Sequence, residues 1–165
     1  MTELNRTPGR SDLVFAIDAP RADDVRRLLE AHLAYSYEFS PPEHVHALDV
    51  NGLLDSAVTF FSARRDGVLL AVGALKHLDA SHGEIKSMHT SEGARRQGIG
   101  RAMLGHLLAV ARERHYRQVS LETGTMAAFE AARAMYAGAG FTVCEPFGDY
   151  SDNPYSTCMT IRLDP

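Results

Sequence analysis

One stretch decides how this sequence folds: Arg95-Arg96-Gln97-Gly98-Ile99-Gly100-Arg101. It joins a predicted strand at residues 84–90 to a predicted helix with an amphipathic stripe. Glycines let a ligand approach the main chain, and a helix that begins there presents unpaired N–H groups to an anion. The three arginines add positive charge, and a guanidinium group can bind two phosphate oxygens at once. The stretch therefore predicts a site for a pyrophosphate.

Two other nucleotide-binding patterns do not fit this stretch. The pattern G-x-G-x-x-G would need a glycine where Met103 stands, and G-x-x-x-x-G-K-[ST] would need a lysine that the stretch lacks. The stretch also lies in mid-chain, after several predicted antiparallel strands, whereas a dinucleotide fold places its glycines after the first strand. We therefore do not expect a Rossmann site.

A second signal lies further along the chain. A predicted helix carries Tyr136, ends at Gly140, and is followed at once by Phe141, which begins a strand. With both signals the sequence resembles the GNAT superfamily of N-acetyltransferases, whose members carry [RQ]-x-x-G-x-[GA] at a strand–helix junction and Y-x-x-x-G-F later. The resemblance covers residues 13–163. Further stretches that resemble a bacterial subgroup of small GNAT proteins are residues 40–49, 73–76, 83–90, 121–124 and 146–150.

The predicted elements agree with this resemblance. Alternation and β-rich runs predict strands at residues 13–17, 58–64, 68–75, 84–90, 118–123, 141–145 and 157–163, and Arg65-Asp66-Gly67 predicts a hairpin between the second and the third. Helices are expected after Pro20, from Ile99 and over residues 127–138, and a loop with one helical turn over residues 35–51. The fold class is α/β in its α+β variant: one domain at residues 13–165 after a loose tail at 1–12, with helices on both faces of a mixed, mostly antiparallel sheet. The resemblance implies about seven strands and a splay between the fourth and the fifth.

Composition excludes several classes of protein. The chain has 165 residues, of which 45% are hydrophobic and 23% are charged, as in ordinary globular domains. Its net charge of -4 offers no footprint for nucleic acid or an anionic membrane, and no apolar run is long enough for a membrane span. Cys144 and Cys158 are far apart in sequence and form no C-x-x-C pattern. We expect reduced thiols and a cytoplasmic protein with no nucleic-acid or membrane partner.

The resemblance implies that acetyl-CoA is the acyl donor. Main-chain amides of the decisive stretch would bind its pyrophosphate: Arg95, Arg96, Gln97, Gly98, Ile99, Gly100 and Arg101. Backbone groups of Met88, His89 and Thr90 would hold the pantetheine arm like an added strand. The superfamily often has Asn seven residues before the helix tyrosine, where this chain has Phe129. An aromatic ring there would pack against the cofactor in place of a polar contact.

The implied reaction is direct attack of a neutral amine on the thioester in a ternary complex. It needs a proton acceptor for the amine and an acid for the leaving thiolate. Tyr136 stands at the superfamily's acid position, although a tyrosine there could also be a packed helix residue. Glu84, expected to share a strand face with Met88, is the first candidate for the base. Glu122 is the second, and a chain of waters is the third.

The resemblance places the acceptor pocket at residues 35–49 and 146–156, which include Ser40 and His46. Lys86 shares a strand face with Glu84, so it could bind the carboxylate of an amino acid or another zwitterion. An internal Lys–Glu pair that only orders the strand is the alternative. His44 and His46 lack a third ligand at a diagnostic spacing, so no metal site is expected.

These observations predict an acetyl-CoA-dependent N-acetyltransferase that acts on the primary amine of a small molecule, an amino acid or related zwitterion being one option. Two alternatives stay open: transfer to an amine of a protein or peptide, and a non-catalytic acyl-CoA-binding module. Many members of the superfamily are dimers, so a homodimer is expected by analogy alone.

Overall fold

The structure is a computed structural model that describes residues 12–164, so the predicted tail lies outside the described residues except for Asp12. The strands are β1 (Val14–Ile17), β2 (Val58–Arg65), β3 (Val68–Asp79), β4 (His82–Thr90), β5 (Gln118–Gly124), β6 (Thr142–Cys144) and β7 (Ser156–Arg162). The α-helices are α1 (Asp23–Phe39), α2 (Val50–Leu53), α3 (Ile99–Glu113) and α4 (Glu130–Gly138). Short 3-10 helices are η2 (Pro42–His44), η3 (Glu92–Ala94) and η4 (Ala127–Phe129).

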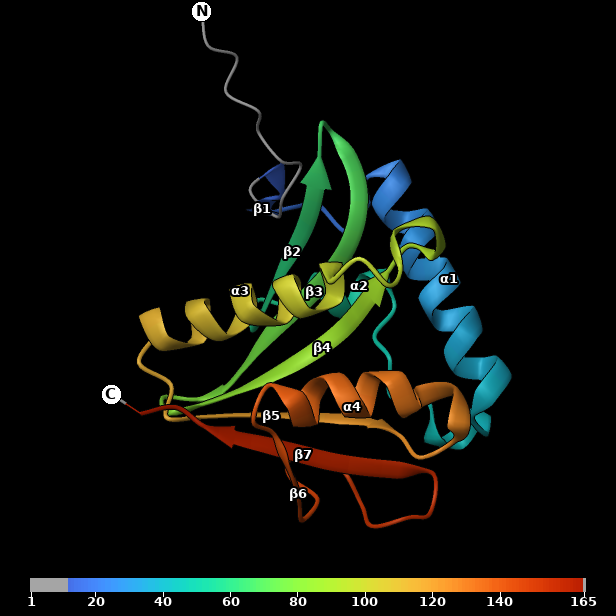
Figure 1. Ribbon diagram of the computed structural model, residues 1–165. Coiled ribbons are helices and arrows are strands. Elements are labelled where there is room, and N and C mark those ends of the chain that lie inside the picture. Colours follow the sequence, from blue (N-terminus) through green and yellow to red (C-terminus); the bar gives the residue numbers. More distant parts are fainter. Residues whose placement is uncertain (1–11, 165) are drawn as a thin grey trace, which may run out of the picture.

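Within these residues the seven strands form one sheet in the order β1-β2-β3-β4-β5-β7-β6 (Figure 1). Strands β4 and β5 are parallel, and every other neighbouring pair is antiparallel. The predicted mixed, mostly antiparallel sheet is therefore confirmed. The β2–β3 hairpin turns at Asp66 and Gly67, whose φ angles of 52° and 80° are left-handed, as a tight hairpin turn requires.

Helices cover both faces of the sheet, as predicted. Figure 1 shows α3 and α4 crossing the strands on one side, and the apolar residues of both helices join one core with Ile85 and Leu121. Helix α1 buries Val25 and Leu29 in a second core with residues of β2 and β3 on the other side. The stripe predicted for α3 is buried at every position: Ile99, Met103, Leu104, Leu107, Leu108 and Ala111.

The first helix is longer than the sequence predicts. Helix α1 continues through Phe39, where a loop was expected from residue 35. No proline or glycine interrupts it before Pro41, and the Tyr35 hydroxyl donates a hydrogen bond to the Ala128 carbonyl oxygen at 2.6 Å. The loop expected to contain one helical turn contains η2 and is followed by a second turn, α2, which Asp49 caps by accepting a hydrogen bond from the Gly52 amide at 2.8 Å.

Strands β4 and β5 separate soon after they meet. They pair at only three positions, His82 with Gln118, Gly83 with Val119 and Glu84 with Ser120. Beyond Glu84 the strands diverge, which confirms the splay and opens the middle of the sheet.

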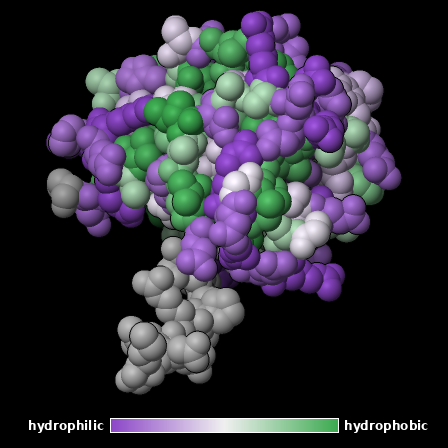
Figure 2. Space-filling view, turned by 90° about the horizontal axis from the view of Figure 1, so that it is seen from above, coloured by the Kyte–Doolittle hydropathy of each residue, from purple (hydrophilic) through white to green (hydrophobic). Residues whose placement is uncertain are grey.

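The outer surface is mixed in character. Figure 2 shows hydrophobic residues interspersed with hydrophilic ones on the face seen from above. Among residues 12–164, no helix combines the length and the apolar character that a membrane crossing requires.

Candidate active site

A cavity of about 740 Å³ lies where β4 and β5 diverge. Helix α1, the residues after it, the stretch that leads into α3, helix α4 and Tyr150 complete its wall. Pockets of this size suit small molecules and cofactors. Every residue predicted for the site lines the cavity except Gln97, whose side-chain amide donates to the Gly93 carbonyl oxygen at 3.3 Å.

One end of the cavity is suited to an anion. Helix α3 begins after Gly98, whose φ of 77° is a left-handed conformation that glycine adopts easily. No side chain of the described residues caps this helix, so its first amides carry no side-chain partner. Arg95, Arg96 and Arg101 are exposed around it. Free amides and three cations fit the pyrophosphate of a CoA thioester.

The middle of the cavity is shaped by a bulge in β4. Ser87 has a φ of 56°, and the register between β3 and β4 shifts beside it. The extra residue reverses the alternation of side chains along the strand. Met88 therefore packs into the α3 core, whereas Glu84 lies on the other face of the sheet. The expectation that Glu84 and Met88 share a face is wrong, because strict alternation does not continue through a bulge.

Three side chains form a closed network at the other end. Lys86 Nζ lies 3.3 Å from Glu84 Oε2, and the two side chains are only 9% and 4% exposed. The Tyr150 hydroxyl donates to the same Glu84 oxygen at 2.5 Å and accepts from Lys86 Nζ at 2.7 Å. Lys86 is thus held in an internal pair, the alternative that the sequence left open.

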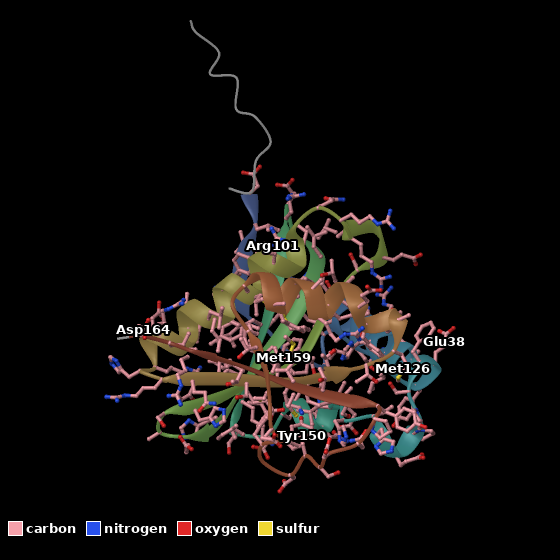
Figure 3. All side chains as sticks on the ribbon, turned by 60° about the horizontal axis from the view of Figure 1, so that its bottom comes forward. Glu38, Arg101, Met126, Tyr150, Met159 and Asp164 are labelled. Atoms are coloured by element: carbon pink, nitrogen blue, oxygen red, sulfur yellow. The ribbon has the colours of Figure 1, made fainter. Side chains whose placement is uncertain are left out.

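Tyr150 was not identified from the sequence, although its segment was expected to line the acceptor pocket. In the chain Tyr150 lies in the segment that connects β6 to β7, and its side chain reaches past β5 to β4. The resemblance of residues 146–150 to the bacterial subgroup, with two aromatic residues in that stretch, is a signal that could have indicated it; in the structure the ring centroids of Phe147 and Tyr150 lie 5.0 Å apart. Figure 3 shows Tyr150 and Arg101 at opposite ends of the molecule, with Met159 between them.

Glu122 and Tyr136 face the cavity from β5 and α4. Burial raises the pKa of Glu122, and the Ser156 hydroxyl and Lys86 offset part of that rise. Burial and the nearby Glu122 raise the pKa of Tyr136 far above its usual range. Tyr136 therefore keeps its proton at neutral pH, as an acid must before it donates.

Two histidines meet between α1 and β4. The Nδ1 atoms of His32 and His89 lie 3.2 Å apart, and both rings line the cavity. Burial lowers the pKa of His32 to about 4, and burial with His32 and Arg95 nearby lowers the pKa of His89 to about 3. Both rings are neutral near pH 7, so one Nδ1–H donates to the other ring. His32 was not among the residues predicted for the site.

Phe129 packs against the protein wall of the cavity. Its ring lies 5.7 Å from that of Tyr35, edge to face, and covers Gly124 at the end of β5. The cofactor contact proposed for Phe129 stays a prediction.

The remaining acceptor candidates also line the cavity. His46 meets the Tyr150 ring edge to face at 5.1 Å, and Ser40 lies at the end of α1. Burial lowers the pKa of His46, with Lys86 and His44 adding to the effect. Within residues 12–164, no three His, Cys, Asp or Glu side chains are grouped so that they could hold a metal ion.

Cys144 and Cys158 face each other across β6 and β7, although they are distant in sequence. Both are free thiols. Burial raises the pKa of each, that of Cys158 to about 11, so the reactive thiolate form is scarce.

Comparisons with known proteins agree with this arrangement. The model of the acetyltransferase (GNAT) family matches residues 23–141. The uncharacterized N-acetyltransferase YsnE of Bacillus subtilis (strain 168) is 45% identical over 147 residues, which cover 89% of this chain and 97% of that protein. A Klebsiella pneumoniae protein described as a candidate acyl-CoA N-acyltransferase has a TM-score of 0.78 at 26% identity, over 92% of this chain and 98% of its own. A GNAT family acetyltransferase from Elizabethkingia anophelis, solved with acetyl-CoA bound, has a TM-score of 0.69 at 16% identity, over 93% of this chain and 100% of its own.

Proposed function

Because this chain belongs to the acetyltransferase (GNAT) family and uses acetyl-CoA, we propose that it transfers the acetyl group to the primary amine of a small molecule. The proposal rests on one observation: a single cavity connects an anion site with a buried tyrosine that can act as an acid and with two carboxyl groups. Arg95, Arg101 and the first amides of α3 form the anion site, and Glu84, Glu122 and Tyr136 lie beyond it. This class of acceptor includes both simple amines and zwitterions such as amino acids.

The anion site would hold the CoA pyrophosphate on the first amides of α3, with Arg95, Arg96 and Arg101 around it. From there the cavity runs along β4, where main-chain groups of residues 88–90 are available to the pantetheine arm because β5 has moved away. This path leads the thioester toward the two glutamates and Tyr136. When bound, acetyl-CoA supplies the activated acetyl group.

The side chains divide the proton transfers between them. Tyr136 keeps its proton until the CoA thiolate leaves and then donates it. Glu122 receives the proton of the acceptor ammonium, because its carboxyl is in no ion pair with a described residue. Glu84, already bound by Lys86 and Tyr150, is the alternative acceptor, directly or through water.

We infer a cytoplasmic location from the same chemistry. Acetyl-CoA is an intracellular acyl donor, and Cys144 and Cys158 are free thiols although they face each other.

The test is release of CoA thiol from acetyl-CoA with a panel of simple amines, free amino acids and lysine-containing peptides. We expect release with a small amine and a loss of at least tenfold in Tyr136→Phe. Tyr37→Phe, which removes an exposed hydroxyl from α1, is the matched control. Release with peptides alone would indicate a protein acetyltransferase. Thermal stabilisation by acetyl-CoA with no release for any amine would indicate a binding module.

A further inference from the structure

The charges at the acceptor end of the cavity are unequally compensated. Glu84 and Lys86 lie on β4, and Glu122 lies on β5. Lys86 and Glu84 neutralise each other at 3.3 Å and are both almost fully buried. Because Lys86 pairs with Glu84, the Glu122 carboxyl forms no ion pair with any lysine, arginine or histidine among residues 12–164.

Tyr150 fixes this distribution of charge. Its hydroxyl bridges Lys86 and Glu84, and Lys86 Nζ also lies 5.4 Å from the centre of its ring. An ammonium group has three N–H donors, and two of those on Lys86 are directed at Tyr150 and Glu84. A carboxylate on the acceptor would have to compete with these partners for the one nearby cation.

The Tyr150 ring is itself held in place. Phe147 packs against it at 5.0 Å, and His46 from the segment after α1 packs at 5.1 Å. Through Tyr150, these contacts connect strand β4 with both segments that form the wall of the acceptor end, the segment after α1 and the segment between β6 and β7. The hydroxyl position is therefore set by packing on both sides, so a change of the hydroxyl alone leaves the wall intact.

The other groups at this end do not supply a positive charge. Burial lowers the pKa of His46, so its ring is neutral near pH 7. Arg95, Arg96 and Arg101 lie around the start of α3, and Figure 3 shows Arg101 far from Tyr150. A cationic ligand therefore meets a carboxyl group here, whereas an anionic ligand meets no free partner.

We propose that the acceptor is an alkylamine with no carboxylate beside its amino group, that Glu122 binds its ammonium, and that Tyr150 enforces this choice by holding Lys86 on Glu84. This proposal rests on the proposed function and narrows its acceptor class. Tyr150 acts through Lys86 and Glu84, so it is a positioning residue.

The experiment compares free amino acids that have a single amine with their decarboxylated amines, such as tyrosine with tyramine and phenylalanine with phenethylamine. For the wild type we expect kcat/KM to be at least tenfold higher for the amine of at least one pair. In Tyr150→Phe the ring stays and Lys86 loses one partner, so the preference should fall at least threefold. The change should appear in the acceptor KM, while the KM for acetyl-CoA stays unchanged.

Two further variants make the result specific. Tyr155→Phe removes a hydroxyl from the same loop and should leave the preference as it is, because Tyr155 does not line the cavity and its ring packs on His44 at 5.0 Å. Lys86→Gln removes the cation and should increase the preference for the amine, which tests the proposal even if Tyr150→Phe unfolds.

The proposal is overturned if the amino acid of each pair is used as well as its amine, or if Tyr150→Phe keeps the full preference. It is also overturned if acetyl-CoA binds and neither member of any pair is acetylated. A different result, no binding of acetyl-CoA in calorimetry, would mean that the proposed function itself has failed.

Discussion

The ring of Phe129 occupies the space that a side chain on Gly124 would need. Gly124 ends β5, and its carbonyl oxygen accepts a hydrogen bond from Arg133 Nη1 at 2.7 Å. The same arginine nitrogen donates to the Met126 carbonyl oxygen at 3.0 Å. The end of β5 is thereby packed tightly against η4 and α4, at the wall of the cavity.

Gly124→Ala should destabilise the protein by about 1–3 kcal/mol, because its methyl group would force the Phe129 ring to move. Urea unfolding measures this change. Gly105→Ala is the matched control, since a side chain there meets open space on α3 and should stabilise the helix by about 0.5–1 kcal/mol. In a Phe129→Ala background the cost of Gly124→Ala should largely disappear. An equal cost in both backgrounds would contradict the steric explanation.

Arg96→Ala and Arg101→Ala should each weaken acetyl-CoA binding on the order of fivefold, because each removes a cation from the phosphate end. Calorimetry at low and high salt should also show a shallower salt dependence in the variants. Arg112→Ala removes an exposed arginine from the last turn of α3 and should bind like the wild type. Unchanged affinity in both test variants would argue against this end as the phosphate site.

Glu122→Gln should lower kcat by about 10²-fold or more, because the amide cannot accept a proton. The burial that raises the pKa of Glu122 also predicts that activity falls as pH drops through that raised value, and the variant should lose this limb of the pH–rate profile. Glu84→Gln should instead raise the acceptor KM and keep the limb. If Glu84→Gln removes the limb and Glu122→Gln does not, the two assignments are reversed.

Acid should destabilise the protein through His32 and His89. Their pKa values are about 4 and about 3 in the folded protein, against 6.5 for an ordinary histidine, so only the unfolded chain takes up these protons between those limits. The free energy of unfolding is therefore highest above pH 6.5 and should fall by roughly 2–3 kcal/mol per histidine toward pH 4. Denaturant titrations across this range measure the slope, and His32→Gln should flatten it. A slope that is the same in this variant would exclude the pair as its source.

Local patterns in the sequence predicted the elements that depend on local chemistry. The turn at Gly67 follows from its conformational freedom, and the buried face of α3 follows from helical spacing. The glycines and arginines of residues 95–101 predicted the anion end of the cavity, and the resemblance added the path of the cofactor from there. These features need no knowledge of which distant residues meet.

Features that depend on distant contacts or on one extra residue were missed. The bulge at Ser87 moves Met88 to the opposite face from Glu84, and nothing in the sequence of β4 marks it. Tyr150 reaches Glu84 only because a loop folds back over the neighbouring strand. Cys144 meets Cys158 because β6 turns back along β7, so separation in the chain gave no guide to their proximity.

The three residue pairs that join β4 to β5 also have a mechanical consequence. They are the narrow seam between two half-sheets, one built from β1 to β4 and the other from β5 to β7. Acetyl-CoA bound in the gap would contact main-chain groups that β4 and β5 leave unpaired, and would restrict the motion of the two half-sheets relative to each other. Loading with acetyl-CoA should therefore slow amide hydrogen exchange on both sides of the seam, well beyond the atoms it touches.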